Sequence, residues 1–286
     1  TLRFWLLLCL ALLLCLALFL AFCTARLTGS PRLAPTIFLL LLGLLATRAF
    51  YAWPGIATPR TQFDAVRSTT TTGSVRVVCL SDTHNHHPDP RAMPDADILV
   101  HAGDFTMAGS RAEAEAFNEW LGRLRHKYRH RIVVAGNHDL ICDRDTFVEN
   151  MQRMKRLRFH GYEGDGKVAP GDLLGHAGVR ALLSNATHYL EHSEARVTVG
   201  ARTLRIFGSP LTDPIEGSSM SAFARDATSR RDGWSRLDAG RENGATAETP
   251  RVDILVTHSP PQGVLDKIFT QMRVGCEVLA ERLAEL

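Results

Sequence analysis

The sequence predicts an α/β domain over residues 75–286, with hydrophobic helices before it. From Val75 onward, short runs of aliphatic residues alternate with segments of helical periodicity, which is typical of α/β proteins. Polar residues follow directly after four of these runs, as they do at the rim of a sheet that carries a ligand site. The expected strands are Val75–Leu80, Asp97–Val100, Arg131–Ala135, Thr203–Gly208 and Val252–Val256.

The composition is that of a globular protein, with 45% hydrophobic and 22% charged residues. The formal net charge of +3 is small for 286 residues, so the sequence does not indicate a nucleic acid as the main partner. The six cysteines show no paired spacing of a disulfide framework or a zinc–thiolate site. Cys79, within the run VRVVCL, is expected to be a small buried residue.

The first 55 residues predict a membrane anchor. Residues 4–22 carry no charged side chain, and as a helix they would extend about 28 Å, close to the hydrocarbon thickness of a bilayer. A second apolar stretch, residues 34–55, can also span if Arg48 reaches the interface. The sequence leaves open whether there is one span or two. A secretory signal peptide fits less well, because the first run is long and lacks a clear cleavage site. Residues 56–74 predict a solvated linker.

The orientation of the anchor is predicted from charge and from cysteine usage. Arg26 and Arg32, between the two apolar stretches, compete with Arg60 and Arg67 beyond them for the cytoplasmic face. The free cysteines favour a reducing compartment. We therefore expect a membrane protein whose α/β domain lies in the cytosol.

A helix is expected between the second and third strands. Ser110 and Glu113 have the spacing of a capping box. After them, apolar residues recur at helical spacing and predict one buried stripe, made of Phe117, Trp120, Leu121 and Leu124. This stripe is explained by core packing alone.

Two further helices and two loops complete the expected domain. One helix runs from about Asp145 to Leu157, and its inner face carries Phe147, Met151 and Met154. The last helix starts near Cys276, and its inner face carries Val278, Leu279 and Leu283. Residues 161–178 and 208–250 predict loops, and the second is too long for a simple connection. It is expected to be a substrate-side loop or partly disordered.

Four of the expected strands end in side chains that can bind a metal or a phosphate. The strands lead into Ser81–His84, His101–Asp104, Gly136–Asp139 and Thr257–Pro261. Gly136-Asn137 alone is also a good turn pair, so no single segment is decisive. Because the carboxyl ends of strands in α/β sheets line one rim, the segments together would meet in one crevice. They would bring together Asp82, His84, Asp104, Asn137, His138 and His258.

These residue types indicate the class of metal. Carboxylate, imidazole and amide groups without a thiolate suit Mn, Fe, Zn or Mg, and they argue against a structural zinc–thiolate site. Asp82 and His84, two residues apart on an extended segment, would point to the same side and hold one ion. Asp104 has two oxygens and can bridge two ions. The expected cofactor is therefore a pair of divalent ions, which can orient a phosphate and activate water.

The ordered motifs resemble those of calcineurin-like metallophosphoesterases, and most closely the branch called metallophosphoesterase domain-containing proteins. They are Asp82-x-His84, Gly103-Asp104, Gly136-Asn137-His138-Asp139 and Thr257-His258, within CLSDTHN, LVHAGDFT, IVVAGNHDL and DILVTHSPPQGVLD. The resemblance covers roughly residues 75–286. It implies the four-layer fold of that family, in which two β-sheets pack together with helices outside.

The resemblance also implies roles for these side chains. Asp82, His84 and Asp104 would hold the first ion, and Asp104 would bridge to a second. The second ion would also be held by Asn137 and His258. His138 would be the general acid or would stabilise the leaving group, and Asp139 would orient its ring.

The sequence departs from the family pattern in one respect. The last motif of the family, Gly-His-x-His, supplies a ligand to each ion, and no histidine follows His258 here. Because the sequence ends within the helix CEVLAERLAEL, we expect a domain truncated at its C-terminus. A genuine loss of the motif is the alternative, and it would fit a catalytically inactive, membrane-anchored binding module.

The predicted function is hydrolysis of phosphodiesters or phosphomonoesters by a hydroxide that two metal ions activate. The substrate would be a small phosphoester, and the resemblance favours diesters such as cyclic nucleotides. The membrane is a predicted partner through the N-terminus, and the sequence predicts no oligomeric state. A protein phosphatase is a weaker alternative, because no extended peptide-docking feature is visible.

Other polar residues are expected to be structural or solvated. His86 and His87 fit a solvated loop better than a ligand role. His101 is expected either to support a ligand by hydrogen bonding or to pack in the core. Three arginines after position 220 fit a solvated charge run better than donors to a substrate phosphate, namely Arg225, Arg230 and Arg231.

Overall fold

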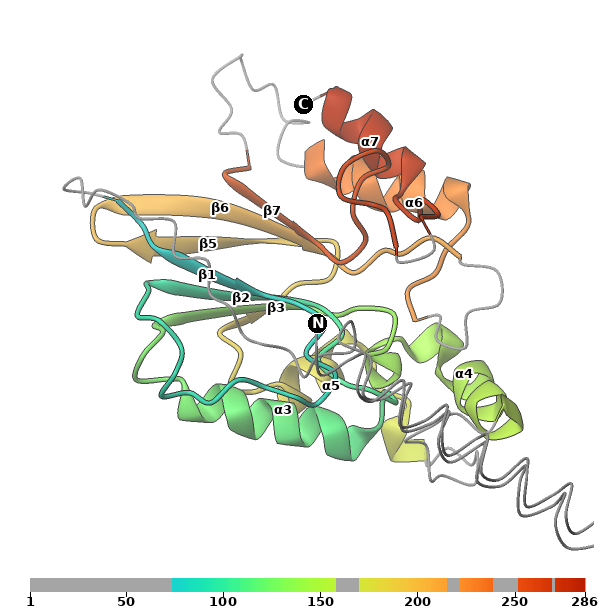
Figure 1. Ribbon diagram of the computed structural model, residues 1–286, viewed down its shortest axis with the longest axis horizontal. Coiled ribbons are helices and arrows are strands. Elements are labelled where there is room, and N and C mark those ends of the chain that lie inside the picture. Colours follow the sequence, from blue (N-terminus) through green and yellow to red (C-terminus); the bar gives the residue numbers. More distant parts are fainter. Residues whose placement is uncertain (1–73, 158–169, 215–221, 239–251, 269–270, 286) are drawn as a thin grey trace, which may run out of the picture. The chain divides into compact units, whose positions relative to one another are not determined.

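The computed structural model describes residues 74–157, 170–214, 222–238, 252–268 and 271–285 (Figure 1). The expected anchor over residues 1–55, and the expected linker except its last residue, lie outside the described residues. Within the described part of the chain, no helix combines the length and the apolar character needed to cross a bilayer.

The first sheet has four parallel strands in the order β1-β2-β3-β4. Its central strand β2 is almost wholly buried, as is typical of a parallel strand covered on both faces. The register pairs Val77 with Ile98, and Ile98 with His130, so the first three strands begin at one edge. The strands are β1 (Val77–Leu80), β2 (Ile98–Ala102), β3 (His130–Val134) and β4 (His188–Tyr189).

The second sheet has three strands in the order β5-β6-β7. Strand β6 pairs antiparallel with β5 and parallel with β7. The strands are β5 (Ser193–Val199), β6 (Arg202–Ser209) and β7 (Ile254–Thr257). Ile98, Val100, Ile132 and Val134 of the first sheet pack against Ala195, Val197, Ile206 and Val256 of the second.

Helices cover the outer faces of both sheets (Figure 1). Below the four-stranded sheet, a core around Phe117, Met154 and Val179 joins α3 (Arg111–Arg123), α4 (Arg144–Leu157) and α5 (His176–Leu182). Beside the three-stranded sheet, a smaller core around Trp234 and Leu279 joins α6 (Ala227–Ser235) and α7 (Glu277–Ala284). Short 3-10 turns are Leu140–Cys142, Pro170–Asp172 and Arg236–Asp238. The α/β class with two sheets and outer helices is confirmed.

Helix α3 forms as its sequence predicts. The Ser110 side chain accepts a hydrogen bond from the Glu113 backbone N–H, and the Glu113 carboxylate accepts from the Ser110 N–H at 2.9 Å. The predicted stripe is buried along its length, and Phe117 and Leu121 are fully inaccessible to solvent. Glu113 also accepts a hydrogen bond from the Asn85 side chain, so the start of the helix is joined to the loop after β1.

The expected strands and helices are present, with ends shifted by a few residues, but several elements were not predicted. These are β4, β5, α5 and α6; α6 lies wholly in the segment 208–250 predicted as a loop, and α5 begins within the segment 161–178. Leu283 was expected on the inner face of the last helix, and this is wrong, because its side chain is exposed in α7.

The prediction that Cys79 is buried is also wrong. In the register of the sheet, Cys79 lies beside Val100, on the face that points toward the second sheet. The second sheet packs mainly over β2 and β3, through β7 and β6 respectively, and β1 is the edge strand of its own sheet. Cys79 therefore remains exposed, although its neighbours in the sequence are apolar.

Candidate metal centre

The polar segments identified in the sequence meet at the carboxyl ends of β1, β2, β3 and β7. The loops after β1 and β2 are joined by backbone hydrogen bonds, from Asp82 N to Gly103 O and from His84 N to Asp104 O, both 3.0 Å. Asp82, His84 and Asp104 all have a positive φ, between 40° and 56°. Such a conformation is uncommon outside glycine and is concentrated at functional sites.

Asp139 joins the loop after β2 to the loop after β3. Its carboxylate is fully buried and accepts hydrogen bonds from the backbone N–H groups of Asp104 (2.8 Å), Thr106 (2.9 Å) and Gly136 (2.7 Å). The Thr106 hydroxyl donates a further hydrogen bond at 2.7 Å. Asp139 therefore fixes the backbone on both sides of the Asp104 side chain.

The Asp104 carboxylate lies at the middle of the centre and is 3% exposed. Its Oδ1 accepts a hydrogen bond from His138 N at 2.8 Å and lies 3.4 Å from His258 Nε2. Its Oδ2 lies 3.7 Å from His84 Nε2 and 4.0 Å from His138 Nε2. Three imidazole rings therefore present the same nitrogen to one carboxylate.

Glycine is required where the backbone passes this carboxylate. A Cβ atom at Gly136 would lie 2.2 Å from Asp104 Oδ1 and 2.7 Å from His258 Cε1. Such contacts are far inside van der Waals distance. Gly136 therefore allows the loop after β3 to approach the carboxylate closely.

Backbone carbonyls orient the rings of His84 and His138. His84 Nδ1 lies 3.2 Å from Thr106 O, and His138 Nδ1 lies 2.8 Å from Met107 O. Because a carbonyl only accepts hydrogen bonds, each Nδ1 carries the proton. In the neutral ring, the lone pair of Nε2 then faces Asp104, as in histidines that bind metals.

His258 is held differently. Its Nδ1 lies 2.9 Å from Ala102 O, and its Nε2 lies 2.9 Å from Asn137 Oδ1 and near Asp104. Both nitrogens therefore face acceptors, and in this arrangement both carry protons. Burial lowers the pKa of His258, but the charges of Asp104 and Asp82 outweigh burial and raise it overall. The centre thus stabilises a positive charge at Nε2.

The donor set fits divalent ions. Among the described residues, the ligand atoms form two groups that could each hold an ion, namely His84, Asp104 and His138, and Asp82, Asp104 and His258. Asp104 belongs to both groups. Imidazole nitrogens and carboxylate oxygens are ligands for Mn, Fe, Zn and, through oxygen, Mg. An ion beside His258 would take the place of the proton on Nε2.

Burial and the charge of Asp104 raise the pKa of Asp139 to about 7, although the hydrogen bonds from Thr106 and Gly136 lower it. The two carboxylates therefore repel each other across the Gly103–Asp104 turn. A cation at the Asp104 carboxylate would reduce this repulsion. The electrostatics of the centre and the geometry of its ligands therefore both favour a cation at the Asp104 carboxylate.

All of the predicted site residues lie at this centre, but two details of the expectation are wrong. Asp82 and His84 were expected to hold the same ion on an extended segment. Their left-handed backbone is not extended, so that part of the expectation is wrong. The ligand atoms of Asp82 and His84 fall into different candidate groups, and their binding of one ion stays a prediction. Asp139 was expected to orient His138. Its carboxylate instead binds backbone N–H groups, and the carbonyl of Met107 binds the His138 ring.

The carbonyls of Ala102, Thr106 and Met107 are functional groups that the sequence did not indicate. Each accepts a hydrogen bond from one of the centre's histidines. Because every residue has a carbonyl, no side-chain pattern could identify these three. Their positions follow from the end of β2, where Ala102 lies, and from the turn after it, which carries Thr106 and Met107.

Several other polar residues differ from the expectation of solvated side chains. His87 is half-buried beside Trp120, and its Nδ1 lies 3.0 Å from Thr83 Oγ1. Burial lowers the pKa of His87 to about 4. His101 is fully buried and its Nε2 contacts the same hydroxyl at 3.0 Å, so it both packs in the core and supports the loop that carries Asp82.

The arginines after position 220 are also held by specific partners. Arg225 binds Asp143 at 2.8 Å, Arg230 lies 2.7 Å from Asp213, and Arg231 lies 3.7 Å from Glu281. The expectation of a solvated charge run is therefore wrong for the first two, which are largely buried. Arg225 and Arg230 are explained by packing within the domain.

The fold and the centre define a class of protein: a two-sheet α/β domain with carboxylate and imidazole ligands gathered at the strand ends. The sequence model of the family described as calcineurin-like phosphoesterase matches residues 75–280. The chain belongs to this family.

Relatives with curated sequences agree with this assignment. The chain is 38% identical over 205 residues to metallophosphoesterase domain-containing protein 1 of Homo sapiens, covering 71% of this chain and 54% of the relative. It is 31% identical over 205 residues to a UPF0046 protein of Caenorhabditis elegans, covering 72% of this chain and 46% of the relative. The chain thus spans about half the length of the curated relatives it matches.

Proposed function

We propose that this chain is a metal-dependent phosphoesterase that uses two divalent ions joined by Asp104. The observation that carries the proposal is the position of this carboxylate, which each candidate metal group uses. Membership of the calcineurin-like phosphoesterase family supports hydrolysis of phosphoric esters in general. The two-ion arrangement is our reading of the centre's geometry.

The described side chains suggest how the ions would be held. Asp82, Asp104 and His258 would hold one ion, with the Asn137 amide beside them. Asp104 and His84 would hold the other. A pair of divalent ions orients a phosphate, lowers the pKa of water so that hydroxide can attack, and stabilises the charge of the departing oxygen.

We propose that His138 protonates the leaving group. Its ring lies against His84, with 4.6 Å between the ring centroids, and its side chain is one-fifth exposed, so it stands at the open side of the centre. Met107 holds Nδ1, which leaves Nε2 to carry the transferred proton. Nε2 must be protonated before it can act as an acid.

We further propose that the substrate is a small phosphoester, such as a nucleotide or a cyclic nucleotide, and that residues 4–22 anchor the chain in a membrane with the domain in the cytosol. The family supports a small phosphoester in general, and the nucleotide is our proposal. The uncharged apolar run supports the second.

Hydrolysis of model esters by the 286-residue chain tests the proposed function. We expect turnover of bis-p-nitrophenyl phosphate or p-nitrophenyl phosphate with Mn²⁺, and none with a chelator. Asp104→Asn should reduce the rate by at least about 100-fold, because it removes the shared ligand. Asp232→Asn, the same change at an exposed residue of α6, should leave the rate unchanged. Binding of Mn²⁺ without turnover of either ester would contradict catalysis and favour a binding module.

A further inference from the structure

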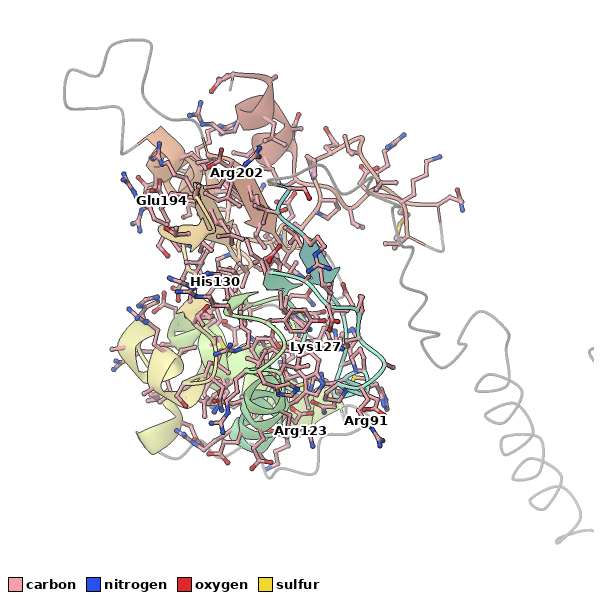
Figure 2. All side chains as sticks on the ribbon, turned by 90° about the vertical axis from the view of Figure 1, so that its left-hand side faces the viewer. Arg91, Arg123, Lys127, His130, Glu194 and Arg202 are labelled. Atoms are coloured by element: carbon pink, nitrogen blue, oxygen red, sulfur yellow. The ribbon has the colours of Figure 1, made fainter. Side chains whose placement is uncertain are left out.

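A group of exposed arginines lies at the edge of the domain where the strands begin. Residues 123–131, between α3 and β3, read RLRHKYRHR. Arg123, Arg125 and Arg129 of this segment are exposed, as is Arg202 at the start of β6. None of these four arginines forms an ion pair with another described residue, and together we call them the basic rim. Figure 2 shows Arg202, Lys127 and Arg123 following one another down this face.

The basic rim spans both sheets. His130 starts β3, and its Nε2 contacts Thr198 O at 3.1 Å, which joins the segment of residues 123–131 to the end of β5. Val77, Ile98 and His130 are in register, so β1, β2 and β3 all begin beside the rim. The metal centre lies at the other ends of the same strands.

Four acidic residues near this edge have partners outside the basic rim. Asp95 lies 3.4 Å from Lys127 Nζ, and Glu194 binds Arg205 Nε at 3.1 Å. Asp97 accepts a hydrogen bond from Arg76 N at 2.8 Å, and Asp253 accepts from Arg205 N at 2.7 Å. Among the described residues, none of these four carboxylates forms an ion pair with an arginine of the basic rim, so the four guanidinium groups can meet an external anionic surface.

We infer that the basic rim docks on the anionic headgroups of a lipid bilayer. The chain enters the domain through β1, at the edge where the rim lies, and the sequence before β1 contains the uncharged apolar run of residues 4–22. A membrane-bound segment there would hold the rim at high local concentration near lipid. Clustered arginines beside a membrane segment are attracted to anionic lipids.

This docking fixes the orientation of the domain. A solvated linker of the expected length, residues 56–74, can extend for tens of ångströms and would by itself allow any orientation. The charge of the basic rim selects one of them. Because the metal centre lies at the opposite strand ends, it faces away from the bilayer and stays open to soluble substrates.

Protection from trypsin tests this inference. The 286-residue chain is bound to vesicles of phosphatidylcholine alone or with phosphatidylserine, and cleavage is followed by mass spectrometry. With phosphatidylserine, we expect cleavage after Arg125 and Arg129 to slow by about threefold or more, and about 0.5 M NaCl to remove the difference. Cleavage after Lys267, an exposed residue in the loop after β7, should be the same on both vesicles.

A pair of matched variants separates the basic rim from charge in general. Arg123→Gln with Arg202→Gln should remove most of the protection at Arg125 and Arg129. Lys155→Gln with Arg156→Gln removes the same charge from exposed positions of α4 and should leave the protection intact.

Three results would overturn the inference. Equal cleavage after Arg125 on the two vesicles, or equal protection on both, would mean that anionic lipid does not hold the rim. Protection at Lys267 instead would place the other edge of the domain on the membrane. Failure of the chain to associate with phosphatidylserine vesicles would also overturn it, and none of these readouts depends on hydrolysis.

Discussion

Backbone carbonyls orient both histidines that face Asp104 Oδ2. Thr106 O holds His84 and Met107 O holds His138, so adjacent residues of one turn set the direction of both rings. A rigid turn loses less entropy on binding an ion than long flexible side chains would. The turn itself is fixed by Asp139, through the backbone and hydroxyl of Thr106.

The role proposed for His138 predicts a dependence on the leaving group. His138→Asn should retain Mn²⁺ and should lower the hydrolysis of phenyl esters by about 100-fold or more. Esters of p-nitrophenol should be affected much less, because p-nitrophenolate departs without a proton. His126→Asn, at an exposed position after α3, is the control. An equal loss for both classes of ester, or the loss of an ion, would show that His138 is a metal ligand instead.

Replacing Asp139 by asparagine should lower the stability of the domain. In Asp139→Asn, the amide replaces one carboxylate oxygen with a donor, so at least one buried backbone N–H loses its acceptor. We expect the free energy of unfolding to fall by about 1–3 kcal/mol at pH 8, measured with urea. Asp232→Asn, an exposed control, should change it by less than about 0.5 kcal/mol. No loss in Asp139→Asn would mean that these hydrogen bonds do not hold the turns.

At the scale of elements, Asp143 joins α4 to residues 222–225. Its carboxylate is buried, binds Arg225, and accepts hydrogen bonds from Phe223 N at 2.6 Å and Thr146 Oγ1 at 2.7 Å. Ala222 N donates to Asn137 O at 3.2 Å, so the joined segment also contacts the loop of the metal centre. A buried charge pair thus connects a helix to the functional loop.

This pair predicts a specific dependence of stability on pH. Burial by itself would raise the pKa of Asp143, but the hydrogen bonds and charge of Arg225 and the Phe223 N–H outweigh it and hold the pKa below 3.8. Because the folded pKa is below the unfolded one, the stabilisation is present above about pH 4 and is lost as pH falls through the folded pKa.

We therefore expect Asp143→Asn to lower the free energy of unfolding by about 1–3 kcal/mol at pH 6. This is less than for a fully buried ion pair, because the Arg225 side chain is partly exposed and solvent screens its charge. The difference from the unmodified chain should shrink between about pH 5 and pH 3. Urea titrations across this range measure it. A difference that stays constant with pH would contradict the role of the ionised carboxylate.

The elements that the sequence predicted have local signals, and the missed ones depend on distant partners. Helix α3 carries its own cap and apolar stripe. Strand β4 has two residues, too few for a periodic pattern, and its partner is β3. Helix α6 buries Arg230 and Trp234 instead of an aliphatic stripe, and Arg230 is paired with Asp213. Strand β5 did carry a signal, because Ala195 and Val197 alternate with polar residues.

The sequence could predict which residues meet at the site, because strand ends gather at one edge of an α/β fold. Asp82, Asp104 and Asn137 follow three parallel strands of one sheet, and His258 joins them because β7 of the second sheet packs over β2. The grouping of ligands was not predictable, because it depends on left-handed backbone at Asp82 and His84. Neither was the binding of Asp139 to backbone N–H groups, which carry no sequence signal.

On the scale of the whole domain, the strands separate two surfaces of different chemistry. Their carboxyl ends carry the buried carboxylate and imidazole groups around Asp104, and their amino ends carry the basic rim. Loops at the carboxyl ends of α/β strands are the usual place for ligands. The proposed link between this fold and its function is an Asp104 carboxylate shared by two ions.

Mn²⁺ binding followed by electron paramagnetic resonance tests this claim most directly. With the 286-residue chain, we predict two Mn²⁺ per chain and the spectrum of a coupled pair, because ions that share a carboxylate lie about 3.5–4 Å apart. Asp104→Asn should lose the coupling and at least one ion, while Asp232→Asn should keep both. A single bound Mn²⁺, two uncoupled ions, or an unchanged spectrum in Asp104→Asn would show that Asp104 does not join two ions.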